Sequence, residues 1–214
     1  NLSNLSGHPA QVFERLGIVN QTAVSDEAPA SPGLFSVVVL VGMPGSGKST
    51  IARALSRKLR LALADSDQAI EQRLGCSIRS YFDSHGEPAF RDVEEAVIDE
   101  LTRGGASLVL ATGGGAVLRP VNRQRLRERG TVIYLRSSPE QLFKRLRHDT
   151  KRPLLQVADP LKRLRALYDE RDPLYRECAH FVVDTHGSSL PMLVNRIMMQ
   201  LDLMPPPAPP PPAP

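Results

Sequence analysis

The sequence predicts an α/β fold, a three-layer sandwich in which helices cover both faces of a five-stranded parallel sheet. Two observations carry this prediction. Short apolar segments alternate along the chain with helical patterns, and a glycine-rich turn directly follows the first apolar segment. Continuous apolar runs without interleaved polar residues are typical of parallel strands that are buried on both faces.

The predicted elements follow one another in strand–helix order. Strands are expected at residues 37–41, 61–64, 107–111, 131–135 and 181–183. Helices are expected at residues 51–60, 69–74, 91–101, 122–129, 138–147, 161–169 and 190–201. Residues 148–160 are polar and interrupted by two prolines, which predicts a long loop between two helices.

The domain organisation follows from length and composition. A chain of 214 residues with 41% hydrophobic and 23% charged residues suits one globular domain, which we expect at residues 35–203. Residues 1–34 are rich in Ser, Asn, Pro and Ala and predict a weakly ordered arm. Residues 204–214 are proline-rich and predict a disordered tail, because proline cannot donate to helix or sheet ladders.

Composition also indicates which kinds of molecule the protein is expected to bind and where it is expected to work. The net charge is +4, but no aromatic residues interleave with the basic ones, so we expect no nucleic-acid partner. No uncharged apolar window is long enough to span a bilayer, so no membrane partner is expected. The two cysteines fit no metal spacing and no disulfide framework, which favours a reducing cytoplasm. We expect a monomer.

A phosphate-binding loop is the strongest motif. Residues 42–49 match the pattern G-x-x-x-x-G-K-[ST], with an apolar strand before them and a helical pattern after them. Glycines allow backbone N–H groups to turn inward around an anion, the lysine can reach the β- and γ-phosphates, and the serine can bind magnesium. A bare strand-to-helix turn is the alternative. We assign ATP binding to Gly45, Ser46, Gly47, Lys48, Ser49 and Thr50, with Ser49 as a magnesium ligand.

Polar segments after the second and third predicted strands belong to the same predicted edge, because ligands collect at the carboxyl ends of parallel strands. Asp65 and Asp67 are two residues apart and would share one side of an extended segment, as a water-mediated magnesium ligand and a group facing an acceptor hydroxyl. Capping of the helix at residues 69–74 by Asp65 or Ser66 is an equally open alternative. Three glycines at 113–115 allow a ligand to approach the backbone closely, or form only a bare loop.

The motifs taken together resemble the shikimate kinase family. GMPGSGKS, DSD, GEPAFRDVE, ATGGGAV, KRPLL and RDPLY occur in the order and spacing of that family over residues 36–185, and the betaproteobacterial type is most similar. The resemblance implies a fold like that of P-loop nucleoside-monophosphate kinases, with strand order 2-3-1-4-5. It also implies that the γ-phosphoryl group of ATP, with Mg2+, is transferred to the 3-hydroxyl of shikimate, in chorismate and aromatic amino-acid biosynthesis.

The resemblance further implies a role for each matching residue. Asp67 would bind the shikimate hydroxyls and act as general base, while Asp65 would hold a magnesium-bound water. Lys48 and Arg152 would act on the transferred phosphoryl group, and Arg145 would stack on adenine near residues 184–185. The shikimate carboxylate and ring would lie against Arg91, Arg171, Gly113, Gly114 and Gly115.

Two other functions are alternatives to the phosphorylation of shikimate. A ligand-sensing regulatory domain of the same fold would normally follow a DNA-binding module, for which residues 1–34 are too few and show no pattern. A kinase for another hydroxy acid, such as gluconate, is the other alternative. The paired arginines at positions 91 and 171 favour shikimate, because arginine makes two-pronged contacts to carboxylates.

Overall fold

The computed structural model describes residues 37–103, 107–146 and 157–204. Within that part of the chain, five parallel strands form one sheet in the order β2-β3-β1-β4-β5, which confirms the predicted architecture and strand order. The central strand β1 lies between β3 and β4, with Val39 opposite Leu110 and Val132. The strands are β1 (Val37–Val41), β2 (Ala62–Asp65), β3 (Leu108–Ala111), β4 (Thr131–Arg136) and β5 (Phe181–Asp184).

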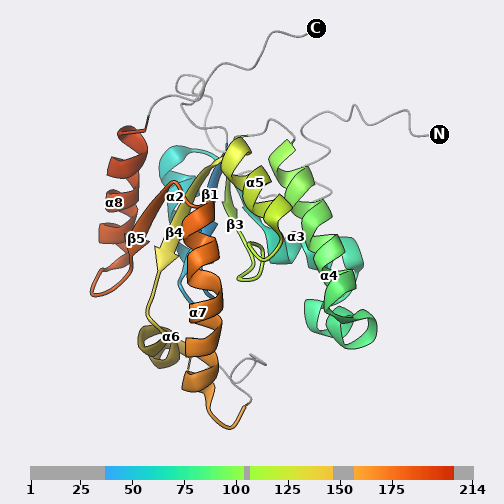
Figure 1. Ribbon diagram of the computed structural model, residues 1–214. Helices are drawn as coiled ribbons and strands as arrows, with labels where there is room; N and C mark the ends of the chain where they lie inside the picture. Colours follow the sequence, from blue (N-terminus) through green and yellow to red (C-terminus); the bar gives the residue numbers. More distant parts are fainter. Residues whose placement is uncertain (1–36, 104–106, 147–156, 205–214) are drawn as a thin grey trace, which may run out of the picture.

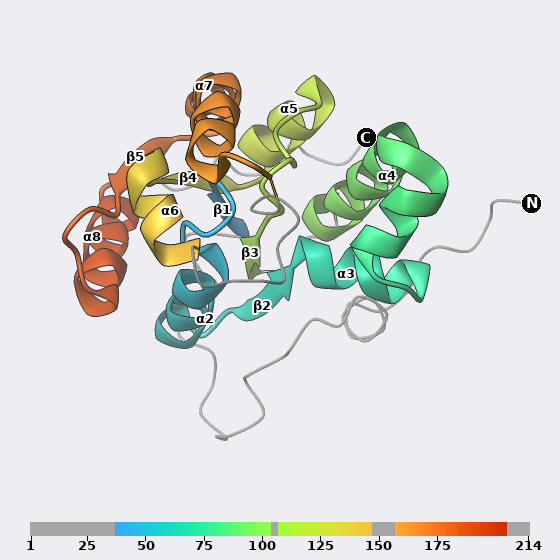
Figure 2. The same cartoon turned by 90° about the horizontal axis from the view of Figure 1, so that it is seen from below.

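Alternate residues of each strand supply the two cores, because successive side chains of a strand point to opposite faces. Val38 and Leu40 of β1 face a core shared with α2 (Lys48–Leu59) and α8 (Leu190–Asp202). Val37, Val39 and Val41 face a core shared with α4 (Ile78–Arg103), α5 (Pro120–Arg129) and α7 (Pro160–Cys178). Figures 1 and 2 show these helices as the two outer layers. Two shorter helices, α3 (Ser66–Leu74) and α6 (Pro139–Leu146), complete the second core.

Two helices are longer than predicted. Residues 78–90 were not assigned to a helix, yet α4 includes them and bends at Gly86, whose φ of 79° and ψ of 173° are not helical. The predicted start of a helix at Arg91 is therefore wrong. The predicted end of α7 at residue 169 is also wrong, since the helix continues through Pro173 to Cys178. Burial of Tyr175 and Cys178 offsets the cost of about 3 kcal/mol for proline inside a helix.

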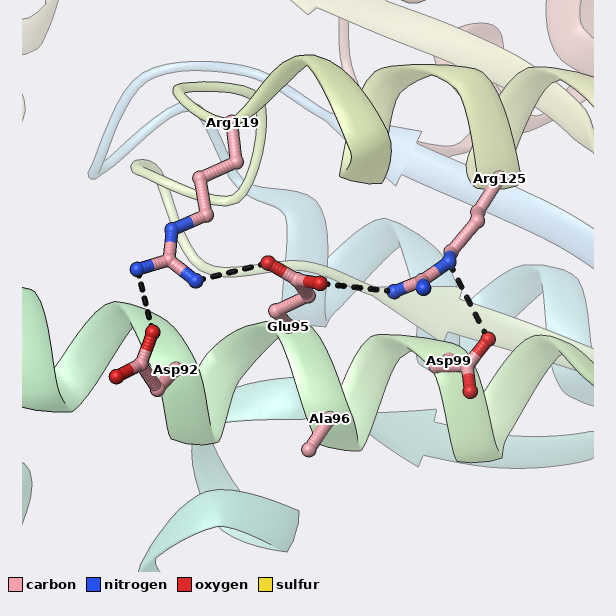
Figure 3. Close-up of a pocket in the computed structure, with 6 residues that line it drawn as sticks. All are labelled: Asp92, Glu95, Ala96, Asp99, Arg119 and Arg125. Carbon is pink, nitrogen blue, oxygen red and sulfur yellow. Dashed lines mark hydrogen bonds and ion pairs between the residues drawn. The ribbon is translucent and has the colours of Figure 1, made fainter.

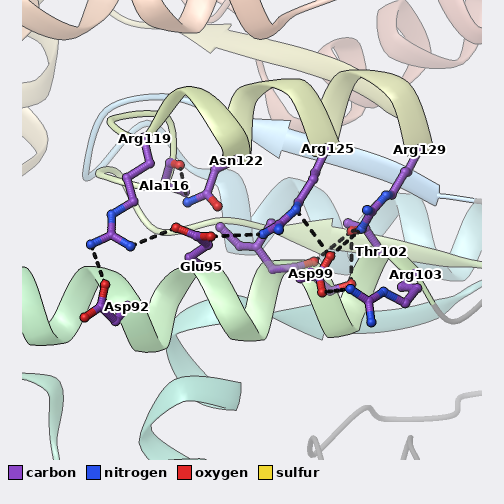
Figure 4. Close-up of polar contacts among 11 residues, drawn as sticks. Asp92, Glu95, Asp99, Thr102, Arg103, Ala116, Arg119, Asn122, Arg125 and Arg129 are labelled. Atoms are coloured by element: carbon purple, nitrogen blue, oxygen red, sulfur yellow. Dashed lines mark hydrogen bonds and ion pairs between the residues drawn. The ribbon is translucent and has the colours of Figure 1, made fainter.

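An ion-pair ladder joins α4 to α5 on the outside of the sandwich. Three carboxylates of α4 pair with two arginines of α5, with the residue that precedes α5 and with the last residue of α4, and Figures 3 and 4 show the contacts. The members are Asp92, Glu95 and Asp99 with Arg103, Arg119, Arg125 and Arg129. A surface pocket of about 350 Å3 lies along this ladder, but the charged groups that line it pair with one another. We therefore treat the ladder as a contact that holds α5 against α4.

Candidate active site

The phosphate-binding loop connects β1 to α2. Gly45 and Gly47 have φ values of 81° and 92°, which L side chains rarely adopt. A Cβ atom at Gly45 would also lie 2.8 Å from the Leu146 side chain of α6, so only glycine fits this close approach. Lys48 is buried, and its ammonium group donates to the carbonyl oxygens of Gly42 at 2.8 Å and Met43 at 2.9 Å.

The amino end of α2 opens at this loop. The first turn of α2 contains no acidic residue, so the positive end of the helix dipole is not neutralised there. Ser49 and Thr50 are exposed, and the buried hydroxyl of Ser46 has no hydrogen-bond partner among the described residues. These groups offer donors for an anion, and the lysine adds a positive charge.

Asp65 caps a helix and also contacts a second predicted site residue. Its Oδ1 accepts from the backbone N–H groups of Asp67 at 3.0 Å and Gln68 at 3.4 Å, and so caps α3. Its Oδ2 accepts from the Ser49 hydroxyl at 2.9 Å, which brings together the two predicted magnesium ligands. The expectation of one extended segment is wrong beyond Asp65, because Ser66 already begins the helix.

Asp67 lies in the first turn of α3 and is open to solvent. Protein nevertheless surrounds the carboxylate closely enough that desolvation, followed by repulsion from Asp65, raises its pKa to about 6. Lys48 opposes this shift, while Glu94 adds to it. A carboxylate with a pKa near 6 is suited to accept a proton at neutral pH.

The glycines at positions 113–115 follow β3 and adjoin three different functional segments. A Cβ atom at Gly113 would lie 2.5 Å from the Asp67 carboxylate, and one at Gly114 would lie 2.7 Å from Pro44 of the phosphate-binding loop. A Cβ atom at Gly115 would collide with the guanidinium group of Arg91. The three glycines, which we call the glycine triad, therefore pack closely against Asp67, Pro44 and Arg91, and a larger residue there would displace these groups.

Arg91 and Arg171 approach the same buried carboxylate, Glu94. Arg91 donates to Glu94 at 2.6 Å and to Glu87 at 2.9 Å, and its side chain is only 13% exposed. Burial raises the pKa of Glu94 although Arg91 and Arg171 both lower it. Arg171 is partly buried, and its Nε has no hydrogen-bond partner among the described residues. The pair can receive a second carboxylate.

The segment predicted to surround adenine forms a separate polar cluster. Arg145 of α6 donates to Ser137 at 3.2 Å and to Thr185 at 3.4 Å. Ser137 and Thr185 follow β4 and β5 directly and are both buried. The structure therefore brings Arg145 to the predicted 184–185 segment. Arg152 and most of the predicted loop at 148–160 lie outside the described residues.

Three residues in this site were not singled out from the sequence. Glu94 lies three positions after Arg91 within the helix already predicted at residues 91–101, and this spacing places the two on one helix face. Ser66 accepts a hydrogen bond from the Gly113 N–H at 2.9 Å. Tyr175 donates to the Gly114 carbonyl oxygen at 2.5 Å. Both hydroxyls connect segments far apart in the sequence, which no local pattern indicates.

The assembled groups have a clear chemical capacity. An anion-binding loop with a lysine lies beside a carboxylate that can accept a proton. The glycine triad contacts that carboxylate at Gly113 and Arg91 at Gly115, and Arg171 approaches the same Glu94 as Arg91. Such a site can hold a polyphosphate against a hydroxylated carboxylic acid.

Comparison with known proteins agrees with this capacity. The protein-family model described as shikimate kinase matches residues 44–202. Shikimate kinase of Paracidovorax citrulli is 61% identical over 166 residues, covering 77% of this chain and 91% of that protein. The Burkholderia thailandensis shikimate kinase is 52% identical over 166 residues, covering 78% and 90% respectively.

Solved structures place the fold in the same group. A structure of shikimate kinase from Acinetobacter baumannii in complex with shikimate has a TM-score of 0.74 and 42% identity, covering 78% of this chain and 92% of that one. A gluconokinase from Sinorhizobium meliloti has a TM-score of 0.50 at 18% identity, a likeness that concerns the fold alone. The sequence identities favour a shikimate kinase over both alternatives, the gluconate kinase and the regulatory domain. This chain belongs to the shikimate kinase family.

Proposed function

We propose that this chain transfers the γ-phosphoryl group of ATP to the 3-hydroxyl of shikimate, releasing ADP and shikimate 3-phosphate for the synthesis of chorismate and the aromatic amino acids. The observation that carries the proposal is the position of Asp67. Its carboxylate, with a pKa near 6, lies against Gly113 of the glycine triad, and Gly115 of the same triad lies against Arg91. Glu94, which acts on the Asp67 carboxylate, is also the carboxylate that the arginine pair approaches.

ATP is proposed to bind with its phosphates on the loop at Gly45, Ser46 and Gly47, and at Lys48, Ser49 and Thr50 of α2. Lys48 is already held over the loop by two carbonyl oxygens, so its charge needs little reorganisation to meet a phosphate. Arg145 is proposed to stack on adenine, which its contacts with Ser137 and Thr185 support by fixing its side chain. A role for Arg152 at the transferred phosphoryl group remains a prediction from the sequence.

Shikimate is proposed to lie between Asp67, Arg91, Arg171 and the glycine triad. The buried Nε of Arg171, which has no hydrogen-bond partner within the described part of the chain, supports this placement, because a buried donor without a partner is costly unless a ligand supplies one. Arg91 is preorganised by two carboxylates: its Nε and Nη2 donate to Glu87 and its Nη1 donates to Glu94. Since a guanidinium group has five N–H donors, two remain for a ligand carboxylate. In the reaction, the Asp67 carboxylate takes the proton of the attacking hydroxyl. The new O–P bond forms as the bond between the γ-phosphorus and the β–γ bridging oxygen breaks.

The site also suits Mg2+, which prefers oxygen ligands and keeps several waters. The Ser49 hydroxyl and the Asp65 carboxylate are 2.9 Å apart and both are oxygen donors. No three His, Cys, Asp or Glu side chains gather into a metal site among the described residues, as expected for an ion held mainly by phosphates and water. We propose that Ser49 binds Mg2+ directly and Asp65 through water; when bound, the ion would neutralise phosphate charge.

The proposal also covers the oligomeric state, the location and the partners of the enzyme. Among the described residues, no helix is both long and apolar enough to cross a bilayer. We propose a monomeric enzyme that works in the cytoplasm with shikimate and ATP and without nucleic acid. Residues 1–34 and 204–214 are proposed to be dispensable additions to the 35–203 domain, and the family match at 44–202 supports that division.

A coupled assay of ADP release tests the proposal. The purified chain is supplied with ATP and Mg2+, and with shikimate, gluconate or no acceptor. We expect ADP release that depends on shikimate, with gluconate close to the rate without acceptor. Equal rates with both acceptors would instead favour a kinase of broad hydroxy-acid specificity, and no acceptor dependence would refute the proposal.

A further inference from the structure

We propose that two buried hydroxyl groups, those of Ser66 and Tyr175, are positioning residues that fix the glycine triad between the proton-accepting carboxylate and the arginine pair. The inference rests on the function proposed above and adds two residues to it. Each hydroxyl bonds a different backbone atom of the triad, and each lies next to a different group of the acceptor site.

The hydrogen bonds of the segment from 113 to 119 show why these two contacts differ from the rest. Most carbonyl oxygens of this segment accept from nearby residues: Gly113 from Ala116, Gly115 from Leu118, Ala116 from Asn122, Val117 and Leu118 from Arg123, and Arg119 from Asn122 and Arg123. These bonds shape the loop internally. They do not fix where the loop lies relative to the rest of the site.

The Ser66 and Tyr175 hydroxyls fix where the loop lies, because they connect it to parts of the chain that are distant in sequence. Ser66 lies between Asp65 and Asp67 at the start of α3 and is fully buried. Its oxygen accepts the Gly113 N–H at 2.9 Å across 47 positions of sequence. The bond therefore ties the first glycine of the triad to the helical turn that carries Asp67.

Tyr175 ties the second glycine of the triad to the helix that carries Arg171. It lies one helical turn after Arg171 on α7, and residues four apart share a helix face. Its hydroxyl donates to the Gly114 carbonyl oxygen at 2.5 Å across 61 positions of sequence. Burial raises the pKa of the Tyr175 phenol, so the donor stays protonated at neutral pH.

The ring of Tyr175 is itself held in place. It stacks on Tyr134 with ring centroids 5.0 Å apart, and the Tyr134 hydroxyl donates to Asp172 at 2.8 Å. Tyr134 thus offers a matched control: it is an equally buried member of the same stack, but its hydroxyl does not contact the triad. Asp172 would keep its second contact, from Arg176 at 2.7 Å, if that hydroxyl were removed.

Loss of either hydroxyl should weaken binding of the acceptor, shikimate, rather than binding of ATP. Removing either hydroxyl leaves a backbone group of the triad without its partner, and the triad can then shift relative to Asp67 or Arg171. Small displacements of positioning groups are costly, because reactants must be held within a fraction of an ångström. The phosphate-binding loop keeps its own Ser46 N–H to Met43 carbonyl bond of 3.1 Å and both Lys48 contacts, so ATP binding should change little.

The experiment compares Ser66→Ala and Tyr175→Phe with two control variants that lose a buried hydroxyl elsewhere. The controls are Ser56→Ala, whose hydroxyl donates to the Leu61 carbonyl at 2.6 Å, and Tyr134→Phe. Titration calorimetry measures the Kd of shikimate and of ATP for each full-length variant, and thermal unfolding measures Tm. The wild-type protein is titrated first, and its failure to bind shikimate would refute the proposed function rather than this inference.

We expect the shikimate Kd to rise about tenfold in Ser66→Ala and Tyr175→Phe, the factor that corresponds to one lost hydrogen bond. The ATP Kd of both variants should stay within about twofold of wild type, and both controls should bind both ligands normally. All four variants lose one hydroxyl, so similar changes in Tm are expected. A shikimate Kd unchanged in both test variants, or equal losses for shikimate and ATP, would overturn the positioning role. Tyr175→Phe keeps the stacked ring, so that variant alone decides for Tyr175.

Discussion

Replacing Arg91 with lysine tests the proposed carboxylate clamp without removing its charge. The Arg91 guanidinium group donates to Glu94 at 2.6 Å and to Glu87 at 2.9 Å while only 13% of the side chain is exposed. A lysine ammonium group is a point charge and cannot keep both contacts while also gripping a ligand carboxylate with two parallel bonds. Arg91→Lys should therefore weaken shikimate binding even though the net charge is unchanged.

The expected size follows from one lost charge-assisted hydrogen bond in a largely buried site. Such a bond contributes about 1.5–3 kcal/mol. At about 1.4 kcal/mol per decade, the shikimate Kd should rise roughly ten- to a hundredfold. The ATP Kd should change by less than about twofold, because the contacts proposed for ATP come from α2, α6 and the phosphate-binding loop.

Titration calorimetry on folded protein measures both affinities, and Arg119→Lys is the matched control. Arg119 also makes a two-pronged contact to α4, with Asp92 at 2.7 Å and Glu95 at 2.8 Å, but it does so in the outer ladder (Figure 3). The control should bind shikimate as wild type does. An unchanged shikimate Kd in Arg91→Lys would remove Arg91 from the clamp, and a parallel loss of ATP binding would indicate a general structural role.

Four further predictions concern the same site and the terminal segments. Lys48→Ala should fold normally by circular dichroism and lose nearly all ATP-dependent phosphorylation, because the charge over the transferred phosphoryl group is lost; near wild-type turnover would contradict the ATP assignment. Asp67 has a raised pKa of about 6, so its carboxylate is ionised only above that pH, and kcat/KM for shikimate should fall about tenfold per pH unit below about 6. The same raised pKa means that ionisation of Asp67 disfavours the folded state at neutral pH, so Asp67→Asn should have an equal or higher Tm at pH 7 although it should be inactive. A flat pH profile of kcat/KM would contradict the first of these two expectations, and a large drop in the Tm of Asp67→Asn would contradict the second. Deleting residues 1–34 and 205–214 together should leave kcat and Tm nearly unchanged, and a large loss of either would show that a terminal segment contributes to the domain.

The sheet could be predicted almost completely from the sequence. The three inner strands β1, β3 and β4 contain short runs of buried apolar residues, and the observed strands β1 and β4 differ from the predicted ranges by at most one residue. Parallel strands covered on both faces leave little room for polar residues, so their boundaries are marked in the composition itself. The glycine-rich loop fixed the position of the first helix for the same local reason.

The helices that were misjudged both contain proline. Gly86 and Pro88 indicate a turn, and the chain does bend at Gly86, but helix lies on both sides of the bend. Pro173 indicates a helix end, whereas α7 continues because the residues beyond it are buried under the sheet. Tertiary packing outweighs local preference in both cases, and packing cannot be read from a local pattern.

The predicted site likewise has parts that a local sequence pattern indicates and parts that depend on tertiary packing. Motifs identified the loop at 42–49, Asp65, Asp67 and the glycine triad, because each follows a strand directly. They could not show that Asp65 caps α3 and meets Ser49 at once, or that Glu94 lies between two arginines. These arrangements depend on side chains from separate helices meeting at one edge of the sheet.

The central claim is that a phosphoryl group passes from ATP to one particular oxygen of shikimate within this site. Its most direct test is phosphorus and proton NMR of the product formed when the purified chain is incubated with ATP, Mg2+ and shikimate. The account predicts a single new phosphate monoester coupled to the proton on carbon 3, formed in equal amount to ADP. A phosphate on another hydroxyl, or ATP turned over to ADP and free phosphate alone, would contradict it.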